Sequence, residues 1–439
     1  LAAVLADNPH PRMATCNCLQ IMRRACKRLS SKQRLSSNHR RCFAGVNLDL
    51  FFALDIFALR PLYILSTILM GGYAAIFTLL AQLRSSYGFT EFEIGIITAA
   101  AFIAGFFAQI SLSRLADLGR GSLLMRLGMV LSILGAGWMC IADSLAAWIF
   151  ARVLLGFGAG AVRPAMRRLA FVLNPTKAGE MLGRLAAWEM VGFLMGPIIA
   201  SVLFEIGGLA LPFYCLTGVL MMIFPFVLTV HIPGSDSPLR NPMRVLLKRP
   251  EMQSCLALGV AFYLAVGAFD AIWALFISDL GASQLYIGVT MSLFTLPMIF
   301  VAPYAGRYAA RQNLLLLLMK TLGVATVMII SYAFIKSIWW ICLPLIIHAV
   351  FDAVSMPASQ LAVGRASGEE ALAAGQGLFG ATGLVVAATA SLGGGYLYQT
   401  AGGLAVWLTI AFAMLLFLAV AYWRGRDLVW SHRPDSDLS

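Results

Sequence analysis

The sequence predicts an all-α integral membrane protein with twelve transmembrane helices in two six-helix pseudo-repeats and both termini in the cytoplasm. Hydrophobic residues make up 60% of the 439 positions, charged residues only 12%, and the mean hydropathy is +0.84. A soluble protein of this length needs more surface charge. Apolar segments of about 20 residues, the length that spans a hydrocarbon core, recur along the chain. The same layout occurs twice, offset by about 193 residues, so that Pro164 corresponds to Pro357.

Each copy holds six of the apolar segments. They begin near Pro61, Phe92, Gly121, Leu145, Met181, Leu209, Ser254, Gln284, Asn313, Ile338, Leu372 and Gly402. The prediction is an N-terminal bundle over 61–230 and a C-terminal bundle over 254–425. The proline-rich stretch 231–253 between them is typical of a cytoplasmic linker.

The basic charge is distributed unevenly between the predicted loops. With the amino terminus inside, sixteen loop positions on the cytoplasmic side would be basic, whereas the opposite side keeps little beyond Arg84 and Lys336. This is the positive-inside pattern, which orients both termini toward the cytoplasm. The net charge of +12 therefore indicates topology and contact with anionic lipid rather than a nucleic-acid partner.

Two terminal tails flank the bundles. Residues 1–60 are predicted to be a basic cytoplasmic tail, disordered for most of its length, with an interfacial helix over its last part. Its beginning is such a tail or sequence upstream of a start at Met13 or Met22, and a mitochondrial presequence is the alternative. Residues 426–439 form the second cytoplasmic tail.

Neither a metal site nor an enzyme is indicated. Cys140, Cys215, Cys255 and Cys342 lie singly in apolar segments, where cysteine acts as a small hydrophobe. The four cysteines of the amino-terminal tail fit no common zinc spacing. The sequence has no phosphate-cradling Gly-x-x-x-x-Gly-Lys motif for ATP. We therefore expect no cofactor, and a proton gradient as the energy source.

Four motifs, in order along residues 60–425, resemble the major facilitator superfamily. The first is Ser113-Arg114-Leu115-Ala116-Asp117-Leu118-Gly119-Arg120, which resembles the family loop Gly-x-Leu-x-Asp-Arg-x-Gly-Arg, with Ser113 for the opening glycine and one residue missing. The second is its echo over 303–311, with Ala310 where the repeat would put the aspartate. The third, Arg152-x-x-x-Gly156-x-Gly158, matches the family's Arg-x-x-x-Gly-x-Gly. The fourth, Gly192-x-x-x-Gly196-Pro197, resembles the signature of its drug–proton antiporters, although Ala200-Ser201 stands where two small residues, usually glycines, close it.

Arg152 is the first candidate for proton coupling. A guanidinium in a span is expensive and normally faces a cavity or a partner. The family resemblance implies a part in proton coupling, and Gly156 and Gly158 mark a tightly packed face of the same segment. The alternative is that Arg152 extends to the outer interface.

Three acidic or basic side chains in other spans are further candidates. Glu189, after Trp188, is able to bind and release a proton when buried. The alternative is a fixed ion pair with Arg163. His348 and Asp352 share one face of a helix, as residues four apart do, and form a candidate proton relay. The alternative is that Asp352 neutralises His348 or holds helices together.

Asp270, Trp273 and Trp188 are the candidates for substrate binding. Asp270 would attract a cationic compound, and an indole three residues away would add a cation–π contact. The alternative is that Asp270 lies in an outer vestibule and shapes the helix end. For conformational change we expect close packing and bending at Gly192, Gly196 and Pro197. We also expect a charge lock of Arg114, Asp117 and Arg120, for which a solvated loop is the alternative.

The main functional hypothesis is a secondary transporter of the cell membrane that works by alternating access. Its expected partners are a small-molecule substrate, the proton and membrane lipid, and nothing requires more than a monomer. Proton-coupled export of a moderately apolar or cationic compound fits the antiporter-like signature best. Uptake of a small metabolite by symport or facilitated diffusion is the alternative. A non-transporting receptor or scaffold is a third reading, although the amino-terminal tail alone would then be available for a partner.

Overall fold

The computed structural model describes residues 62–115, 119–173, 178–232, 242–368 and 371–428. Every regular element in these ranges is a helix. The predictions for the tail 1–60, for Asp117 and for most of 426–439 lie outside the described residues. The N-terminal half is taken below as residues 62–232 and the C-terminal half as residues 242–428.

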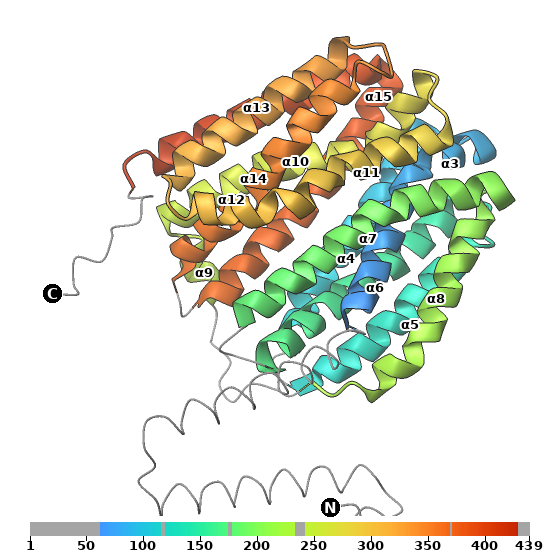
Figure 1. The fold of residues 1–439 in the computed structure, drawn as a ribbon, viewed down its shortest axis with the longest axis horizontal. Helices are drawn as coiled ribbons and strands as arrows, with labels where there is room; N and C mark the ends of the chain where they lie inside the picture. Colours follow the sequence, from blue (N-terminus) through green and yellow to red (C-terminus); the bar gives the residue numbers. More distant parts are fainter. Residues whose placement is uncertain (1–61, 116–118, 174–177, 233–241, 369–370, 429–439) are drawn as a thin grey trace, which may run out of the picture. The chain divides into compact units, whose positions relative to one another are not determined.

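The N-terminal half consists of long apolar helices with short connections (Figure 1). They are Leu62–Thr78, α3 (Leu80–Tyr87), α4 (Glu91–Leu115), α5 (Gly121–Met139), α6 (Leu145–Leu173), α7 (Ala178–Gly207) and α8 (Ala210–Thr229). The first two form one apolar stretch that bends by 48° at Leu79. The short helix α9 (Pro242–Leu246) lies within the stretch 231–253 that was predicted to be the linker.

The C-terminal half repeats this layout with two different interruptions. Its helices are α10 (Pro250–Asp279), α11 (Gln284–Phe300), α12 (Ala302–Ala309), α13 (Leu314–Phe334), α14 (Cys342–Ser367) and α15 (Leu372–Gly425). The segment predicted from Gln284 breaks at Val301, close to the helix-disrupting Pro297. The 54-residue α15 has a non-helical residue at Gly402, with φ 76°, where glycine alone adopts a left-handed conformation without strain.

Nine described helices are long and apolar enough to cross a membrane, or ten if the bent pair counts as one span. This confirms an all-helical protein with multiple candidate spans. In that count α15 is a single span, and α11 falls short of the required length. The sequence predicted a new segment near Gly402, the residue at which α15 departs from helical geometry.

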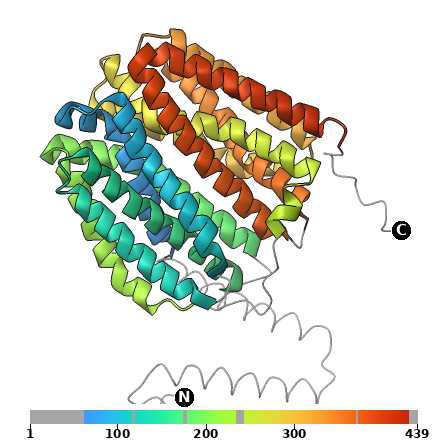
Figure 2. The ribbon, with the colours of Figure 1, turned by 180° about the vertical axis from the view of Figure 1, so that it is seen from behind.

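Two pairs of helices make the main contacts between the halves among the described residues. Helix α7 packs against α11 (Figure 1), and α4 packs against α15 (Figure 2). Helix α10 is the most enclosed of the candidate spans and packs mainly on α15, whereas α8 exposes side chains such as Met222. Exposed apolar side chains on long helices are what a hydrocarbon surrounding requires.

Candidate functional site

An ionic network connects the halves at the ends of α3 and α10. The Arg84 guanidinium donates two hydrogen bonds to the Asp279 carboxylate, one of them 3.1 Å long, and lies 3.2 Å from a Glu91 oxygen. The Tyr398 hydroxyl of α15 donates to the same Asp279 carboxylate over 2.6 Å. We call this end of the molecule the Arg84 end.

We expect Asp279→Asn to weaken the contact between the halves at the Arg84 end. The ion pair is partly exposed, so its loss should cost about 0.2–1 kcal/mol. Spin labels at Glu205→Cys and Lys336→Cys, one in each half, would report a broader distance distribution once the native cysteines are replaced. Asp143→Asn, an exposed aspartate, is the matched control and should change nothing. An unaltered distribution in Asp279→Asn would contradict a holding role.

A second cross-half contact is buried. The Gln284 side-chain nitrogen of α11 donates to the Thr78 carbonyl over 3.0 Å and to the Ser201 hydroxyl over 3.2 Å. Thr78 is the last residue before the 48° bend between the helix Leu62–Thr78 and α3. Gln284 therefore satisfies a carbonyl of one half from the other half.

Glycines allow the helix backbones to meet at three places. A Cβ on Gly395 would lie 2.6 Å from the Glu91 carbonyl, so α15 and α4 touch there. A Cβ on Gly192 would lie 2.0 Å from the Thr67 carbonyl, and one on Gly196 2.3 Å from the Gly71 carbonyl. The predicted Gly192–Pro197 motif is thus the seam between α7 and the helix Leu62–Thr78, as small residues permit.

The glycines of α6 pack on its two neighbours. A Cβ on Gly156 would lie 2.3 Å from the Ala101 carbonyl of α4, and one on Gly158 2.6 Å from the Gly128 carbonyl of α5. Close packing of this segment was expected. Both contacts are with helices of the same half.

Arg152 is fully buried near the start of α6. Its Nε donates to the Ile97 carbonyl over 3.2 Å, and its guanidinium carbon lies 5.5 Å and 5.3 Å from the ring centroids of Tyr73 and Phe77. In the described part of the chain, both terminal nitrogens lack a hydrogen-bond partner. Arg152 therefore does not extend to an interface. Its remaining donors are directed into the protein without an acceptor.

Asp270 and Trp273 share α10 but have different partners. The Asp270 side chain is buried and interacts electrostatically with Arg152 of the other half. The Trp273 indole N–H donates to the Thr290 hydroxyl over 3.1 Å, and its ring stacks on Phe269 at a centroid distance of 4.8 Å. Trp273 is enclosed by rings of the C-terminal half, and Asp270 does not lie in an exposed vestibule.

His348 and Asp352 form a buried pair on α14. The His348 Nε2 lies 3.4 Å from an Asp352 oxygen, and its Nδ1 lies 3.1 Å from the Tyr332 hydroxyl of α13. Within the described ranges neither carboxylate oxygen of Asp352 has a hydrogen-bond partner, because the 3.4 Å approach lacks hydrogen-bond geometry. The Phe294 ring packs edge-on against the imidazole. The predicted face-sharing is present, and Tyr332 joins it.

Glu189 is buried on α7, with 7% of its surface exposed. The alternative partner, Arg163, instead places a nitrogen 2.6 Å from the Met70 sulfur, and no ion pair between Arg163 and Glu189 occurs among the described residues. Trp188 is 42% exposed and stacks on Tyr63 at a centroid distance of 6.2 Å.

The predicted charge lock cannot be followed in the structure. Asp117 and the side chain of Arg114 lie outside the described residues, and Arg120 is exposed just before α5. The lock remains a prediction.

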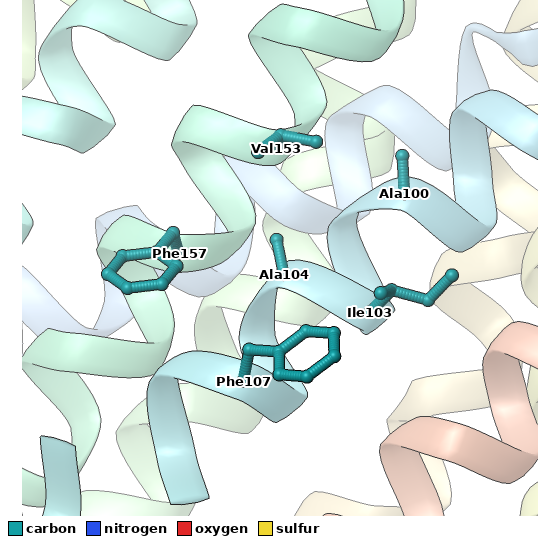
Figure 3. Close-up of a pocket in the computed structure, with 6 residues that line it drawn as sticks. All are labelled: Ala100, Ile103, Ala104, Phe107, Val153 and Phe157. Carbon is teal, nitrogen blue, oxygen red and sulfur yellow. The ribbon is translucent and has the colours of Figure 1, made fainter. Parts of the chain in front are cut away.

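A shallow apolar groove runs between α4 and α6 (Figure 3). Its lining residues are Ala100, Ile103, Ala104, Phe107, Val153 and Phe157. Phe107 is exposed, as expected of a surface that meets lipid acyl chains. Val153 lines the groove, whereas the neighbouring Arg152 is buried against Tyr73 and Phe77, so the groove and the charged site lie on different faces of α6.

Sequence reasoning missed the cross-half contacts of Asp279, Tyr398 and Gln284. One signal was present: Arg84 stood out as one of the few basic residues on the predicted outer side. Its partner Asp279 could not be recognised because Asp279 belongs to the other half, 195 residues away.

Comparison with known proteins gives the family context. A family model described as Major Facilitator Superfamily matches residues 62–347 and 255–437. Relatives include the multidrug resistance protein MdtG of Enterobacter lignolyticus (strain SCF1), 25% identical over 280 residues that cover 61% of this chain and 66% of the relative. The MdtG protein of Proteus mirabilis (strain HI4320) is 28% identical over 255 residues, covering 55% and 63%. The chain thus spans slightly less than two thirds of the length of these relatives.

Solved structures share the fold at low sequence identity. A mutant of the nucleoside transporter NupG aligns with a TM-score of 0.72 and 14% identity, covering 84% of this chain and all of that one. A bacterial homologue of the human lysosomal transporter Spinster, described as inward-facing and occupied, aligns with a TM-score of 0.70 and 15% identity, covering 88% and 99%.

Proposed function

The chain belongs to the major facilitator superfamily, and from this we propose that it is a secondary transporter that exports small compounds in exchange for protons. It is a multi-pass membrane protein. The named relatives are multidrug resistance proteins, which supports the export of drug-like compounds. We propose a moderately apolar or cationic cargo. The protein would act as a monomer in lipid, without a cofactor or catalysis.

We propose twelve spans with both termini in the cytoplasm. The bent pair Leu62–Thr78 and α3 would form the first span, and α11 with α12 the eighth. The break at Gly402 would divide α15 into the eleventh and twelfth. With the basic loops inside, the Arg84 end is external. The contacts of Arg84, Gln284 and Gly395 would then make this an outward-closed state of the alternating-access cycle.

The proposal for proton coupling rests on one observation. The His348–Asp352 pair is buried, and the two Asp352 carboxylate oxygens lack hydrogen-bond partners in the described ranges. A carboxylate in this setting is stabilised by gaining a proton or a charged neighbour. The imidazole and the Tyr332 hydroxyl provide neighbours through which a proton can move. Glu189, buried and without an ion pair to any described residue, is a second candidate group.

We expect Asp352→Asn to abolish compound-driven proton movement, because an amide cannot take up the proton. The purified chain would be reconstituted in liposomes with a pH-sensitive dye and a panel of lipophilic cations and neutral drugs. Proton flux should fall at least tenfold relative to the unaltered protein. Glu189→Gln, run beside it, tests the second carboxylate, and Asp143→Asn is the control. If compounds cross without moving protons, the fold stands and a facilitator replaces the antiporter.

The uptake alternative has less support. The likeness to the nucleoside transporter NupG, at 14% identity, concerns the fold alone. Accumulation of a labelled solute by intact cells that carry the chain would reverse the proposed direction of transport.

A further inference from the structure

Arg152 and Asp270, one in each half, interact electrostatically without forming an ion pair. Arg152 belongs to α6 of the N-terminal half and Asp270 to α10 of the C-terminal half. Each is buried, and they interact electrostatically. No nitrogen–oxygen distance between them is within 4.0 Å. Asp270 forms no hydrogen bond or ion pair with any described residue.

Such an arrangement costs free energy. A buried ion without a partner loses its hydration, with an effective penalty of several kcal/mol per ion. Arg152 recovers part of this through the Ile97 carbonyl and the rings of Tyr73 and Phe77. Its two terminal nitrogens recover none of it from described acceptors. Among the described residues, donors on one half and an acceptor on the other are therefore left without a direct partner, and a further group could satisfy both.

Building on the proposed transport function, we propose that Arg152 and Asp270 form one cargo site. The site takes a compound that carries both an anionic and a cationic group on an apolar body. The anionic group would accept hydrogen bonds from the free Arg152 nitrogens. The cationic group would pair with Asp270, and the body would lie near the Tyr73 and Phe77 rings beside Arg152.

A zwitterion fits this pair better than a simple cation does. A simple cation pairs with Asp270 but leaves the Arg152 donors unsatisfied. A simple anion accepts hydrogen bonds from Arg152 but leaves Asp270 without a partner. A zwitterion satisfies both charges and adds no net charge to a buried site. Because the two residues belong to different halves, movement of the halves changes their separation and loosens the hold on the cargo. Binding and release thus follow from the geometry of alternating access.

The test uses three fluorescent probes that share a dansyl group and a five-carbon chain. They are ε-dansyl-lysine (zwitterion), dansylcadaverine (cation) and 6-(dansylamino)hexanoic acid (anion). The full chain in lipid nanodiscs would be titrated with each probe, without a proton gradient. We expect the zwitterion to bind at least tenfold more tightly than either of the other probes.

Two variants should give crossed results. Arg152→Gln should weaken binding of the zwitterion and the anion at least tenfold and leave the cation unaffected. Asp270→Asn should weaken the zwitterion and the cation and leave the anion unaffected. Lys320→Gln and Asp143→Asn remove exposed charges of the same types and should bind all three probes as the unaltered protein does. A misfolded variant would lose all three probes, so the crossed pattern cannot arise from misfolding.

The order of the three probes' affinities for the unaltered protein tests the proposal even if a variant does not fold. The proposal is overturned if the zwitterion binds no more tightly than the cation, if it does not bind, or if folded Arg152→Gln binds it normally. Equilibrium binding needs no gradient, so such a result leaves proton exchange standing. Conversely, loss of proton flux in liposomes leaves the probe ranking unaffected.

Discussion

Gly395→Leu is expected to open the Arg84 end. The Cβ of residue 395 would lie 2.6 Å from the Glu91 carbonyl and 3.1 Å from the Gly95 Cα. Both atoms belong to the backbone of α4, which cannot move aside as a flexible side chain can. Overpacking typically costs about 1–3 kcal/mol, and this cost applies only where α15 and α4 touch. The closed state should therefore lose roughly 5- to 150-fold in population relative to a state with the two helices apart.

Gly393→Leu is a matched control for this shift. Gly393 lies two residues earlier on α15, and a Cβ there would meet nothing within 4 Å. Both variants place a leucine in the same helix, so the effect on helix propensity is common to them. The spin-label distance between Glu205→Cys and Lys336→Cys should lengthen in Gly395→Leu and stay unchanged in Gly393→Leu. Equal distances in both variants would show that the glycine contact does not hold the Arg84 end closed.

Gly192→Leu is expected to cost about 3 kcal/mol or more of stability, at or beyond the usual range for overpacking. A Cβ at this position would lie 2.0 Å from the Thr67 carbonyl and 2.9 Å from the Thr67 Cα. Both helices belong to the N-terminal half, so the clash exists in every state of the transport cycle. The variant should unfold at a lower temperature in detergent, and a large fraction should aggregate.

Gly218→Leu provides the comparison for the stability measurement. Gly218 lies on α8, where a Cβ would meet nothing within 4 Å, and a leucine there should be tolerated. Gly192→Ala should fall between the two, because even one methyl group meets the Thr67 carbonyl. Normal thermal stability of Gly192→Leu would mean that α7 and the helix Leu62–Thr78 separate easily.

The starts of the apolar segments were accessible from sequence, because a span must be long and apolar whatever it packs against. The segments predicted from Gly121, Leu145 and Gln284 begin at the first residues of α5, α6 and α11. The break at Val301 and the bend at Leu79 were not predicted. Neither interrupts the apolar pattern, and the Thr78 carbonyl at the bend is satisfied by Gln284 from a distant part of the chain.

For the candidate residues, too, the sequence predicted some features and packing decided others. A charged residue in an apolar segment is visible in the sequence, so Arg152, Asp270 and Asp352 could be named at once. His348 could be named as the neighbour of Asp352 because both lie on one helix, but the groups around Arg152 could not be named because they lie on other helices. Arg163 was a reasonable neighbour for Glu189 by position, yet it contacts the Met70 sulfur. The helix rotations that decide such pairings come from packing.

By itself the sequence determined the all-helical membrane class, the repeat, the family resemblance and the places where charge enters the apolar segments. These features depend on local composition and spacing, because the bilayer imposes its requirements on each segment separately. Only the tertiary structure decided which charges meet. It gave Trp273 a partner other than Asp270, joined Tyr332 to His348 and left Arg152 and Asp270 without an ion pair between them. Contacts between helices of different halves depend on how two independently apolar surfaces pack together, and no local pattern in the chain encodes that packing.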